Sequence, residues 1–347
     1  MTTIRNVKLL EELSMTPAIS GNEDKIREII IRELEDSVDD IKTDDMGNVI
    51  CTKKGEADGP TVMLASHMDE IGLMVKYIDK KGFIKFIKIG GINDQMLSNQ
   101  AVIIHHDGKE VPGVIGSKPP HVTKAEEKNK VVPYNEMFID IGADDRQDAE
   151  KMVSVGDMIT LRSWFEEYPN DKVMGKALDN RIGCYVMMEI MKRAESRATI
   201  YGVGTVQEEV GLKGAKVSSY RLNPDYAFAL DTTICGDHPG IKLEESPCKM
   251  GSGPAVILAD RSGDGVITPK VMKDMIINAA DIKDIAIQLE ASDGGTTDAT
   301  AIHLNREGII TGVISVPTRY LHTPVSVASC EDIENTIELM LTILNNI

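Results

Sequence analysis

The sequence predicts an α/β fold, a mostly parallel sheet flanked by helices, into which a mainly β domain is inserted. At 347 residues the chain exceeds the usual size of a single hydrophobic core. Strand-like and helical segments alternate on both sides of the insertion, as in βαβ units whose strands run parallel. Between them lie short β-like runs broken by Gly, Pro and Asp. We therefore expect an α/β domain over residues 1–70 and 172–347, and an inserted β-barrel-like domain over residues 71–171.

The composition is that of an acidic globular protein. Hydrophobic residues make up 42% of the chain, and 38 Lys and Arg against 55 Asp and Glu give a formal charge of −17. This charge would repel nucleic acids and anionic membranes, so we expect neither as a partner. No stretch approaches the roughly 20 apolar residues of a membrane span. Five widely spaced cysteines suggest reduced thiols, so we expect a soluble, cytoplasmic protein.

The first elements lead to a histidine. A helix is expected over Asn22–Asp36, because its isoleucines recur at helical spacing. Two short strands follow around an Asp-Met-Gly turn, over Asp39–Thr43 and Asn48–Thr52. The apolar run Thr61–Ala65 is typical of a buried strand. It ends just before His67, which is therefore expected at the carboxyl end of that strand.

The inserted segment reads as β structure. Its β-like runs are Gly72–Ile78, Phe83–Ile87, Ala101–His105, Val111–Ile115 and Met158–Leu161. Asp107 and Gly108 predict a hairpin turn after His105 and His106, which we interpret as turn residues. The charged stretch Lys124–Lys130 lacks apolar periodicity and predicts a solvated loop.

After Gly175 the alternation of helices and strands resumes. The expected helices are Asp179–Glu195, Gly211–Tyr220, Pro269–Ala280 and Glu331–Ile347. The expected strands are Ala198–Val206, Asp225–Leu230, Ile285–Gln288 and Gly308–Val316. This order again predicts a largely parallel sheet.

Polar side chains recur where these strands end or a helix begins. They are found in Ser-His-Met-Asp at 66–69, Leu-Asp-Asn-Arg at 178–181, Gln-Glu-Glu at 207–209, Leu-Asp-Thr at 230–232 and Arg-Tyr-Leu-His at 319–322. In open α/β sheets the active crevice lies beyond the carboxyl ends of the strands. Two imidazoles and three carboxylates suit zinc, cobalt or manganese better than magnesium or calcium. If two ions share five ligands, one carboxylate must bridge them.

Asp69, Glu208 and Glu209 are expected to have different roles at this site. Asp69, two residues after His67, points the same way along an extended chain and is expected to accept from the imidazole N–H without binding metal itself. Consecutive side chains diverge, so one of Glu208 and Glu209 should bind metal while the other meets the water as a general base.

Each motif alone is also compatible with an ordinary structural role. His-x-Asp pairs occur in turns, Glu-Glu pairs are usually solvated, and Asp-Asn at a helix start is normally a cap. His303 is interpreted as a packed or capping residue, and His238 as part of a loop. Only the ordered recurrence of five such elements supports a metal site.

At these residues the chain resembles the TET, deblocking and glutamyl aminopeptidases of archaea and bacteria, dinuclear metallopeptidases of clan MH. Further matching motifs are Gly-Ser-Lys-Pro-Pro-His at 116–121, Lys-Ala-Leu-Asp-Asn-Arg at 176–181, Thr-Asp-Ala at 297–299 and Pro-Thr-Arg-Tyr-Leu-His at 317–322. The resemblance covers nearly the whole chain. It implies that the α/β domain is a zinc-peptidase-like catalytic domain and that the inserted domain mediates dimerisation.

The resemblance also assigns roles. It implies that Asp179 bridges two ions, with His67 and Asp231 completing one position and Glu209 and His322 the other.

It further implies that Glu208 is the general base and that Asp69 supports His67, and it suggests substrate contacts for His121, Thr297 and Asp298. One glycine of the family's glycine-rich stretch is replaced by Thr296, which affects pocket shape but not the metal ligands.

The activity implied is removal of N-terminal residues from short peptides with two zinc or cobalt ions per subunit. Dimers are expected to assemble into a tetrahedral homododecamer. The alternative is a dinuclear N-acyl amino acid deacylase or carboxypeptidase, which would use similar ligands but different substrate ends. A scaffold without turnover is disfavoured because Glu208 and all five candidate ligands are present. An endoglucanase needs two carboxylates flanking a glycosidic bond, and the histidine-bearing set favours metal-dependent hydrolysis instead.

Overall fold

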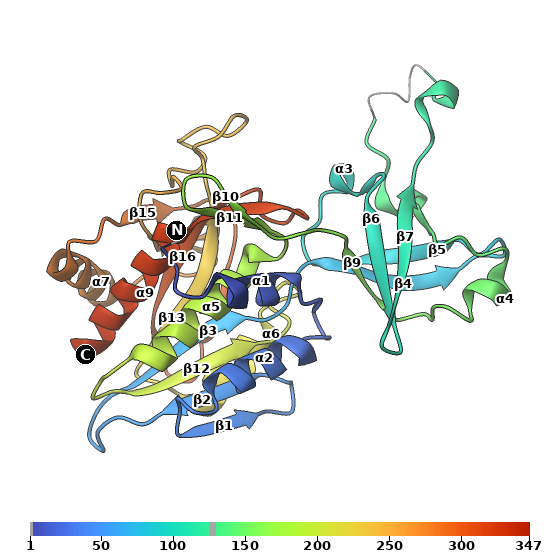
Figure 1. Ribbon diagram of the computed structural model, residues 1–347. Helices are drawn as coiled ribbons and strands as arrows, with labels where there is room; N and C mark the ends of the chain where they lie inside the picture. Colours follow the sequence, from blue (N-terminus) through green and yellow to red (C-terminus); the bar gives the residue numbers. More distant parts are fainter. Residues whose placement is uncertain (1–2, 125–129) are drawn as a thin grey trace.

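Two domains lie side by side in the computed structural model, which describes residues 3–124 and 130–347. An α/β domain carries both chain ends, and a smaller β domain projects from it (Figure 1). The expected fold class is confirmed, with helices on a central sheet and a separate barrel. No helix of the described part of the chain is long and apolar enough to cross a membrane.

The α/β domain is built on an 11-stranded sheet. Its strands, in spatial order, are β1 Asp40–Thr43, β2 Val49–Lys53, β12 Thr199–Thr205, β3 Thr61–His67, β13 Tyr226–Ile234, β16 Ile310–Arg319, β17 Ser326–Ser329, β11 Lys172–Gly175 and β10 Glu166–Tyr168, while β14 Ala255–Ala259 pairs with β16 and β15 Gln288–Ala291 with β14. The four central strands β12, β3, β13 and β16 run parallel, and antiparallel strands flank them. The carboxyl ends of the parallel strands therefore meet at one edge.

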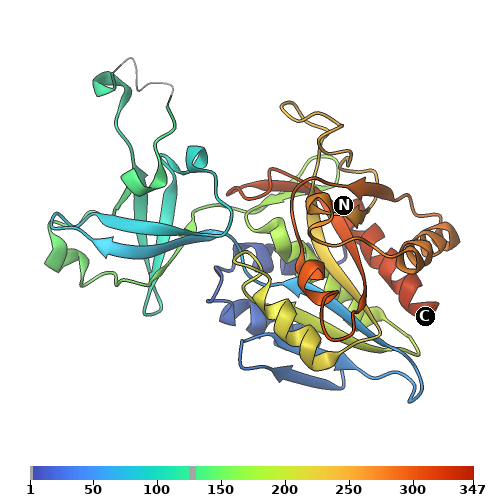
Figure 2. The same cartoon turned by 180° about the vertical axis from the view of Figure 1, so that it is seen from behind.

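Helices cover both faces of this sheet. On one face lie α1 Val7–Met15, α2 Asp24–Leu34, α5 Leu178–Arg193, α7 Lys270–Lys283 and α9 Cys330–Asn345, which share the largest apolar core (Figure 1). On the other lie α6 Lys213–Leu222 and α8 Asp298–Ile302, which pack on a smaller core around Met63 and Ala227 (Figure 2). Helix α5 is buried almost all round, because it lies between the sheet and the other helices.

The inserted domain is a closed barrel with its own core. Its strands, in spatial order, are β4 Gly72–Ile78, β5 Ile84–Ile89, β8 Phe138–Asp140, β7 Lys109–Gly116, β6 Ala101–His106 and β9 Met158–Leu161, accompanied by the short helices α3 Asp94–Leu97 and α4 Arg146–Ala149. The hairpin turn after His106 is confirmed, with positive φ at Asp107 and Gly108. The interpretation of His105 and His106 as turn residues was wrong, because both pair with β7 as the last residues of β6. The expected domain bounds at 71 and 171 stay predictions. Most of the charged stretch 124–130 lies outside the described residues.

Several expected elements differ from the structure. The strand expected over Ile285–Gln288 begins only at Gln288. Asp284 ends α7 in a left-handed conformation, and the next three residues connect the helix to the position where Gln288 pairs with β14. Strand β13 continues to Ile234, since its pairing with β16 extends to that residue. The sequence reasoning missed α1, α3, α4, β8, β10, β11, β14 and β17. Three 3₁₀ turns lie at Pro120–Val122, Tyr134–Glu136 and Arg261–Gly263.

Candidate metal centre

His67 is the last residue of β3, which places its imidazole at the carboxyl edge of the central strands. The side chain is 3% exposed. Its Nε2 atom lies 3.3 Å from Asp179 Oδ1, 3.8 Å from Asp231 Oδ1 and 4.0 Å from Glu208 Oε2. Three carboxylates thus surround one ring nitrogen.

Asp179 lies between the two predicted histidines. It stands at the start of α5, where Asp179 and Asn180 depart from helical geometry and turn the carboxylate out of the helix. One oxygen, Oδ1, faces His67, and the other, Oδ2, lies 3.3 Å from His322 Nε2. A single carboxylate therefore addresses both imidazoles, the geometry a bridging ligand requires.

Asp69 organises the turn that carries the two glutamates. Its Oδ1 accepts from the Glu208 N–H at 3.0 Å, and its Oδ2 accepts from the Glu209 N–H at 3.1 Å and from the Ser20 hydroxyl at 2.6 Å. The expected bond from His67 differs in detail. Nδ1 lies 3.1 Å from the main-chain oxygen of Asp69 and 3.5 Å from its carboxylate, which is already engaged by three donors.

Asp231 projects from inside β13 and not, as predicted, from beyond its end. The ladder with β16 continues past this residue, pairing Asp231 with Ser315 and Ile234 with Thr318. The carboxylate is 9% exposed and accepts from the N–H of Thr232 at 2.8 Å. The Asp231 carboxylate still lies at the same edge of the sheet as His67, because β13 pairs with β3.

His322 follows β16 in an irregular turn. Tyr320 and His322 both have positive φ, which bends the chain back towards the strand ends. Its Nε2 lies 3.3 Å from Asp179 Oδ2 and 3.6 Å from Glu209 Oε1. Its Nδ1 donates to the main-chain oxygen of Gly91 at 2.8 Å.

Two sets of donor atoms result. One contains His67, Asp179 and Asp231, the other Asp179, Glu209 and His322, and the atoms of each set lie within 4.8 Å of one another. Both combine one imidazole with two carboxylates, a donor set typical of zinc and related divalent ions. The residues present therefore fit two divalent cations that share Asp179.

The pKa shifts of the candidate site residues also support a cation site. Burial raises the pKa of Glu208 well above its ordinary value, and the charge of His67 offsets only part of that rise. Burial and the nearby Asp179 raise the pKa of Glu209 to about 7. Burial opposes protonation of His322, but Asp179 and Glu209 outweigh it and raise its pKa to about 10. Crowded buried acids of this kind favour a bound cation, which stabilises their ionised forms.

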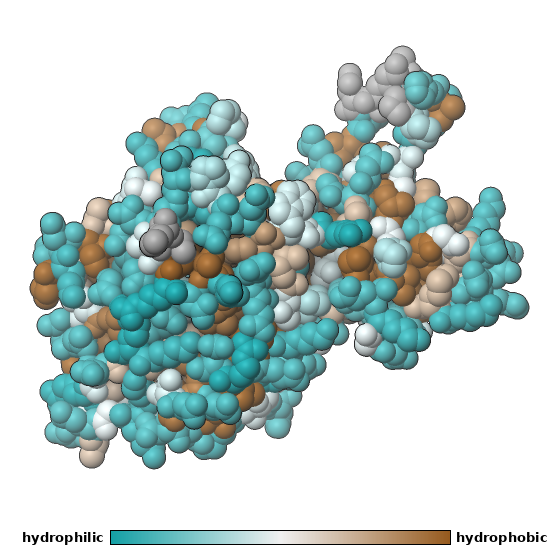
Figure 3. Space-filling view, in the orientation of Figure 1, coloured by the Kyte–Doolittle hydropathy of each residue, from teal (hydrophilic) through white to brown (hydrophobic). Residues whose placement is uncertain are grey.

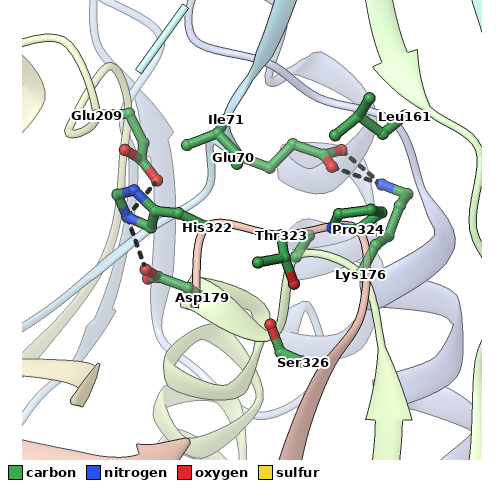
Figure 4. Close-up of a pocket in the computed structure, with 11 residues that line it drawn as sticks. Glu70, Ile71, Leu161, Lys176, Asp179, Glu209, His322, Thr323, Pro324 and Ser326 are labelled. Atoms are coloured by element: carbon green, nitrogen blue, oxygen red, sulfur yellow. Dashed lines mark hydrogen bonds and ion pairs between the residues drawn. The ribbon is translucent and has the colours of Figure 1, made fainter. Parts of the chain in front are cut away.

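A pocket opens beside the second set of donor atoms. It encloses about 370 Å³, open solvent included. Figure 4 shows Asp179, Glu209 and His322 on one side and a buried ion pair on the other. In that pair the ammonium of Lys176 lies 2.6 and 2.7 Å from the two oxygens of Glu70. Residues of both domains line this pocket.

The three residues expected to contact substrate do not line this pocket. Thr297 caps α8, its side chain accepting from Ala299 N–H. Asp298 is 2% exposed and accepts from the Thr205 hydroxyl, and burial raises its pKa to about 6. The charges of His67 and Glu208 interact with that of Asp298, so this carboxylate lies close to the candidate centre. His121 is exposed in the 3₁₀ turn Pro120–Val122 of the connection between β7 and β8, whose described residues we call the arm. Figure 1 shows that this connection projects from the barrel.

Other histidines have structural roles in the described chain. His303 ends α8 and donates from Nδ1 to the Ala299 carbonyl, as the capping interpretation predicted. His238 lies in a loop with its ring tilted against that of Tyr320, the ring centroids 5.1 Å apart. Sequence reasoning missed Glu70 and the glycines at 90 and 91. A Gly-Gly pair at a strand end was the available signal for the latter.

Comparison with known proteins decides the family. The family description M42 glutamyl aminopeptidase matches residues 47–339. The chain belongs to this family. A lysyl aminopeptidase of Pyrococcus furiosus is 35% identical to this M42 peptidase over 345 residues, 98% of this chain and 97% of the relative. The chain is therefore an aminopeptidase, a hydrolase of peptide bonds.

Solved structures agree over the whole length of this M42 chain. A TET aminopeptidase from a marine-sediment Thaumarchaeota archaeon has a TM-score of 0.95 at 39% identity, with 99% of this chain and 96% of that one covered. The TET1 peptidase of Pyrococcus horikoshii, described as assembling into a tetrahedron or a large octahedral shell, has a TM-score of 0.89 at 33% identity, covering 99% and 100%. The barrel and the α/β domain are thus shared features.

Proposed function

We propose that this M42 aminopeptidase hydrolyses N-terminal residues from short peptides with two divalent ions, zinc or cobalt, held by His67, Asp179, Asp231, Glu209 and His322. The observation that carries the proposal is the carboxylate of Asp179, whose two oxygens lie 3.3 Å from two different imidazoles. When bound, the ions would activate a water molecule and polarise the peptide carbonyl.

Glu208 is the proposed general base. Its Oε2 lies 4.0 Å from the metal-facing nitrogen of His67, and its backbone N–H is held by Asp69. Glu209, from the same turn, faces His322 instead. Glu208 can therefore take the proton of the attacking water and deliver it to the departing amine, while Glu209 serves as a ligand.

The assembly is proposed to be a homo-oligomer, with dimers combining into a tetrahedral dodecamer. The similarity to TET1, which forms a tetrahedron, supports this proposal. We further propose a cytoplasmic location, since the buried thiols of Cys51, Cys184, Cys235 and Cys248 form no disulfide, as suits a reducing compartment.

The first experiment compares metal-stripped protein with protein given zinc or cobalt on a panel of aminoacyl p-nitroanilides. We expect metal-restored release of p-nitroaniline from substrates with a free amine and none from N-acetylated ones. An N-acyl deacylase would release the acyl group from N-acyl amino acids instead. A carboxypeptidase would shorten peptides from the other end, which mass spectrometry of a cleaved decapeptide distinguishes. Cleavage that survives complete metal removal would refute the proposal.

A further inference from the structure

The inserted domain touches the second set of metal ligands through two glycines. Gly90 and Gly91 follow β5, in the connection from that strand to α3 of the barrel. The main-chain oxygen of Gly91 accepts from His322 Nδ1 at 2.8 Å, a contact across 231 positions of the sequence. With Nδ1 engaged, Nε2 is the nitrogen that faces Asp179 and Glu209. Such a bond selects the tautomer and the ring orientation of a ligand histidine.

The two histidines differ in where this support comes from. His67 is buried in its own domain, and its Nδ1 is satisfied by Asp69, two residues away. His322 stands on an irregular turn, its side chain 40% exposed, and its Nδ1 is satisfied by the barrel. The histidine of the first set is thus oriented within the α/β domain, and the histidine of the second set is oriented by the inserted domain.

The barrel backbone can lie this close to His322 and Glu209 because Gly90 and Gly91 have no side chains. A Cβ atom at Gly91 would meet His322 Nδ1 at 3.0 Å and Cε1 at 3.2 Å. At Gly90, where φ is +84°, a Cβ atom would meet Ile71 Cγ2 at 2.8 Å and Glu209 Oε2 at 3.1 Å. Glycine therefore lets the barrel backbone lie against both ligands specific to the second set.

A second hydrogen bond joins the barrel to the turn that carries His322. Ser163, just after β9, donates from its hydroxyl to the main-chain oxygen of Pro324, two residues beyond His322. The chain entering the barrel and the chain leaving it contribute Ile71 and Leu161 to the pocket beside His322. The turn that carries His322 is thus held from the barrel at more than one point.

From these contacts we infer that the Gly90–Gly91 loop of the inserted domain positions His322 and Glu209, so that the second metal position forms only while the barrel is docked against the α/β domain. The inference rests on the proposed dinuclear centre and adds a role for the inserted domain beyond assembly. Gly90 and Gly91 act here as positioning residues, through their backbone and their lack of side chains.

The test is a metal titration of full-length variants. In Gly91→Val the backbone is not strained, since φ at this glycine is not positive, but the added atoms displace the imidazole. Gly90→Ala is matched by Gly142→Ala, another barrel glycine with positive φ, +77°, whose Cβ would meet nothing within 4 Å. Ions per subunit are measured by elemental analysis after dialysis, and cobalt binding by visible absorption. Thermal unfolding of the metal-free proteins checks the fold.

We expect Gly91→Val and Gly90→Ala to keep one ion at unchanged affinity and to bind the second about 10–100-fold more weakly, the usual effect of losing support behind a ligand. Gly142→Ala should bind both as the wild type does. Two tightly bound ions in both loop variants, or equal loss of both ions, would overturn the inference.

His322→Ala separates this inference from the proposed function. If His322→Ala loses one ion while the loop variants bind two, the inference alone is wrong. If His322→Ala also binds two ions, the proposed ligand set itself fails.

Discussion

At the scale of single residues, the proposed centre depends on how one carboxylate and one turn are held. Asp179 is withdrawn from the helical geometry of α5, so that its oxygens face in two directions. Asp69 accepts from the backbone N–H groups of Glu208 and Glu209, whose side chains face His67 and His322 respectively. Two adjacent glutamates can therefore perform different tasks.

Glu208→Gln should separate binding from turnover. The amide keeps the size of the side chain but cannot accept a proton, so we expect two ions per subunit and a fall in kcat of about 10²–10⁴-fold. Elemental analysis and p-nitroanilide hydrolysis measure the two effects, with Glu11→Gln, on the first helix, as a surface control. Substantial activity in Glu208→Gln would remove it from the mechanism.

Asp179→Ala should empty both metal positions, because the carboxylate belongs to both donor sets. Asp231→Ala provides the comparison, since Asp231 belongs to one set only and its loss should affect one ion. The readout is the number of zinc ions per subunit after dialysis. Two retained ions in Asp179→Ala would contradict the bridging role.

At the scale of elements, a buried ion pair connects β3, the barrel entry and α5. Glu70 accepts from Lys176, from the backbone of Ala18 and, at 3.5 Å, from Arg181. Lys176 and Arg181 flank the bend that presents Asp179. The pair therefore holds the start of α5 against the strand that ends in His67.

Lys176→Met should destabilise the fold by about 3–5 kcal/mol, because it leaves the Glu70 carboxylate buried without its closest cation. The double variant Glu70→Gln with Lys176→Met should recover only part of that loss, because it removes the unpaired carboxylate but leaves the buried guanidinium of Arg181 without its acid. Urea unfolding of metal-free protein measures both. A single-variant loss below about 0.5 kcal/mol, the scale of an ordinary surface change, would show that the pair is not structurally important.

Glu290, on β15, predicts a pH dependence of stability. The side chain accepts from the Thr233 hydroxyl at 2.8 Å and from the Cys248 thiol at 3.3 Å, and burial raises the pKa of its carboxyl. The folded protein therefore binds this proton more tightly than the unfolded chain. Stability from this group is complete below the unfolded pKa, near 4.3, and is lost as pH rises through the folded pKa.

Glu290→Gln does not titrate, so its free energy of unfolding relative to the wild type should increase between pH 5 and pH 8. Each unit of pKa displacement corresponds to about 1.4 kcal/mol. Urea unfolding at both pH values, with wild type and variant in parallel, gives the difference. If the unfolding free energy of the variant minus that of the wild type stays constant or falls as pH rises, ionisation of Glu290 does not destabilise the folded protein.

At the scale of the whole molecule, the barrel carries apolar side chains exposed on its arm. Val122, Val131 and Val132 are exposed there, Val122 to 62%. Figure 3 shows hydrophobic patches on the barrel beside a largely hydrophilic α/β domain. Burial of such side chains in an assembly stabilises it by about 25 cal/mol per Å² of apolar surface.

Charges on this arm should therefore weaken the proposed assembly. We expect Val122→Asp combined with Val131→Asp to shift the protein to smaller species in size-exclusion chromatography with light scattering. Leu304→Asp, at a residue of the α/β domain exposed to 72%, is the control and should leave the mass unchanged. An unchanged mass in the arm variant would exclude these valines from the interface.

How far the sequence was sufficient differs between parts of the molecule. The strands leading to His67 and to Glu208 were predicted, because a continuous apolar run that ends at polar residues is typical of a buried strand. Strands β10, β11 and β17 are too short to show such a run. Strands β10 and β11 form a hairpin, which joins the sheet through the pairing of β11 with β17, far away in sequence. Asp231 was placed at a strand end, whereas pairing with β16 carries the strand past it.

The sequence by itself determined the types of the candidate ligands and the edge of the sheet at which they gather. Parallel strands bring their carboxyl ends together whatever lies between them in the chain. Only the tertiary structure decided that Asp69 holds the glutamate turn and that Gly91 of the barrel orients His322. The reason is physical, because hydrogen bonds to main-chain atoms leave little trace in side-chain patterns, and the docking of two domains brings together residues that no local periodicity relates.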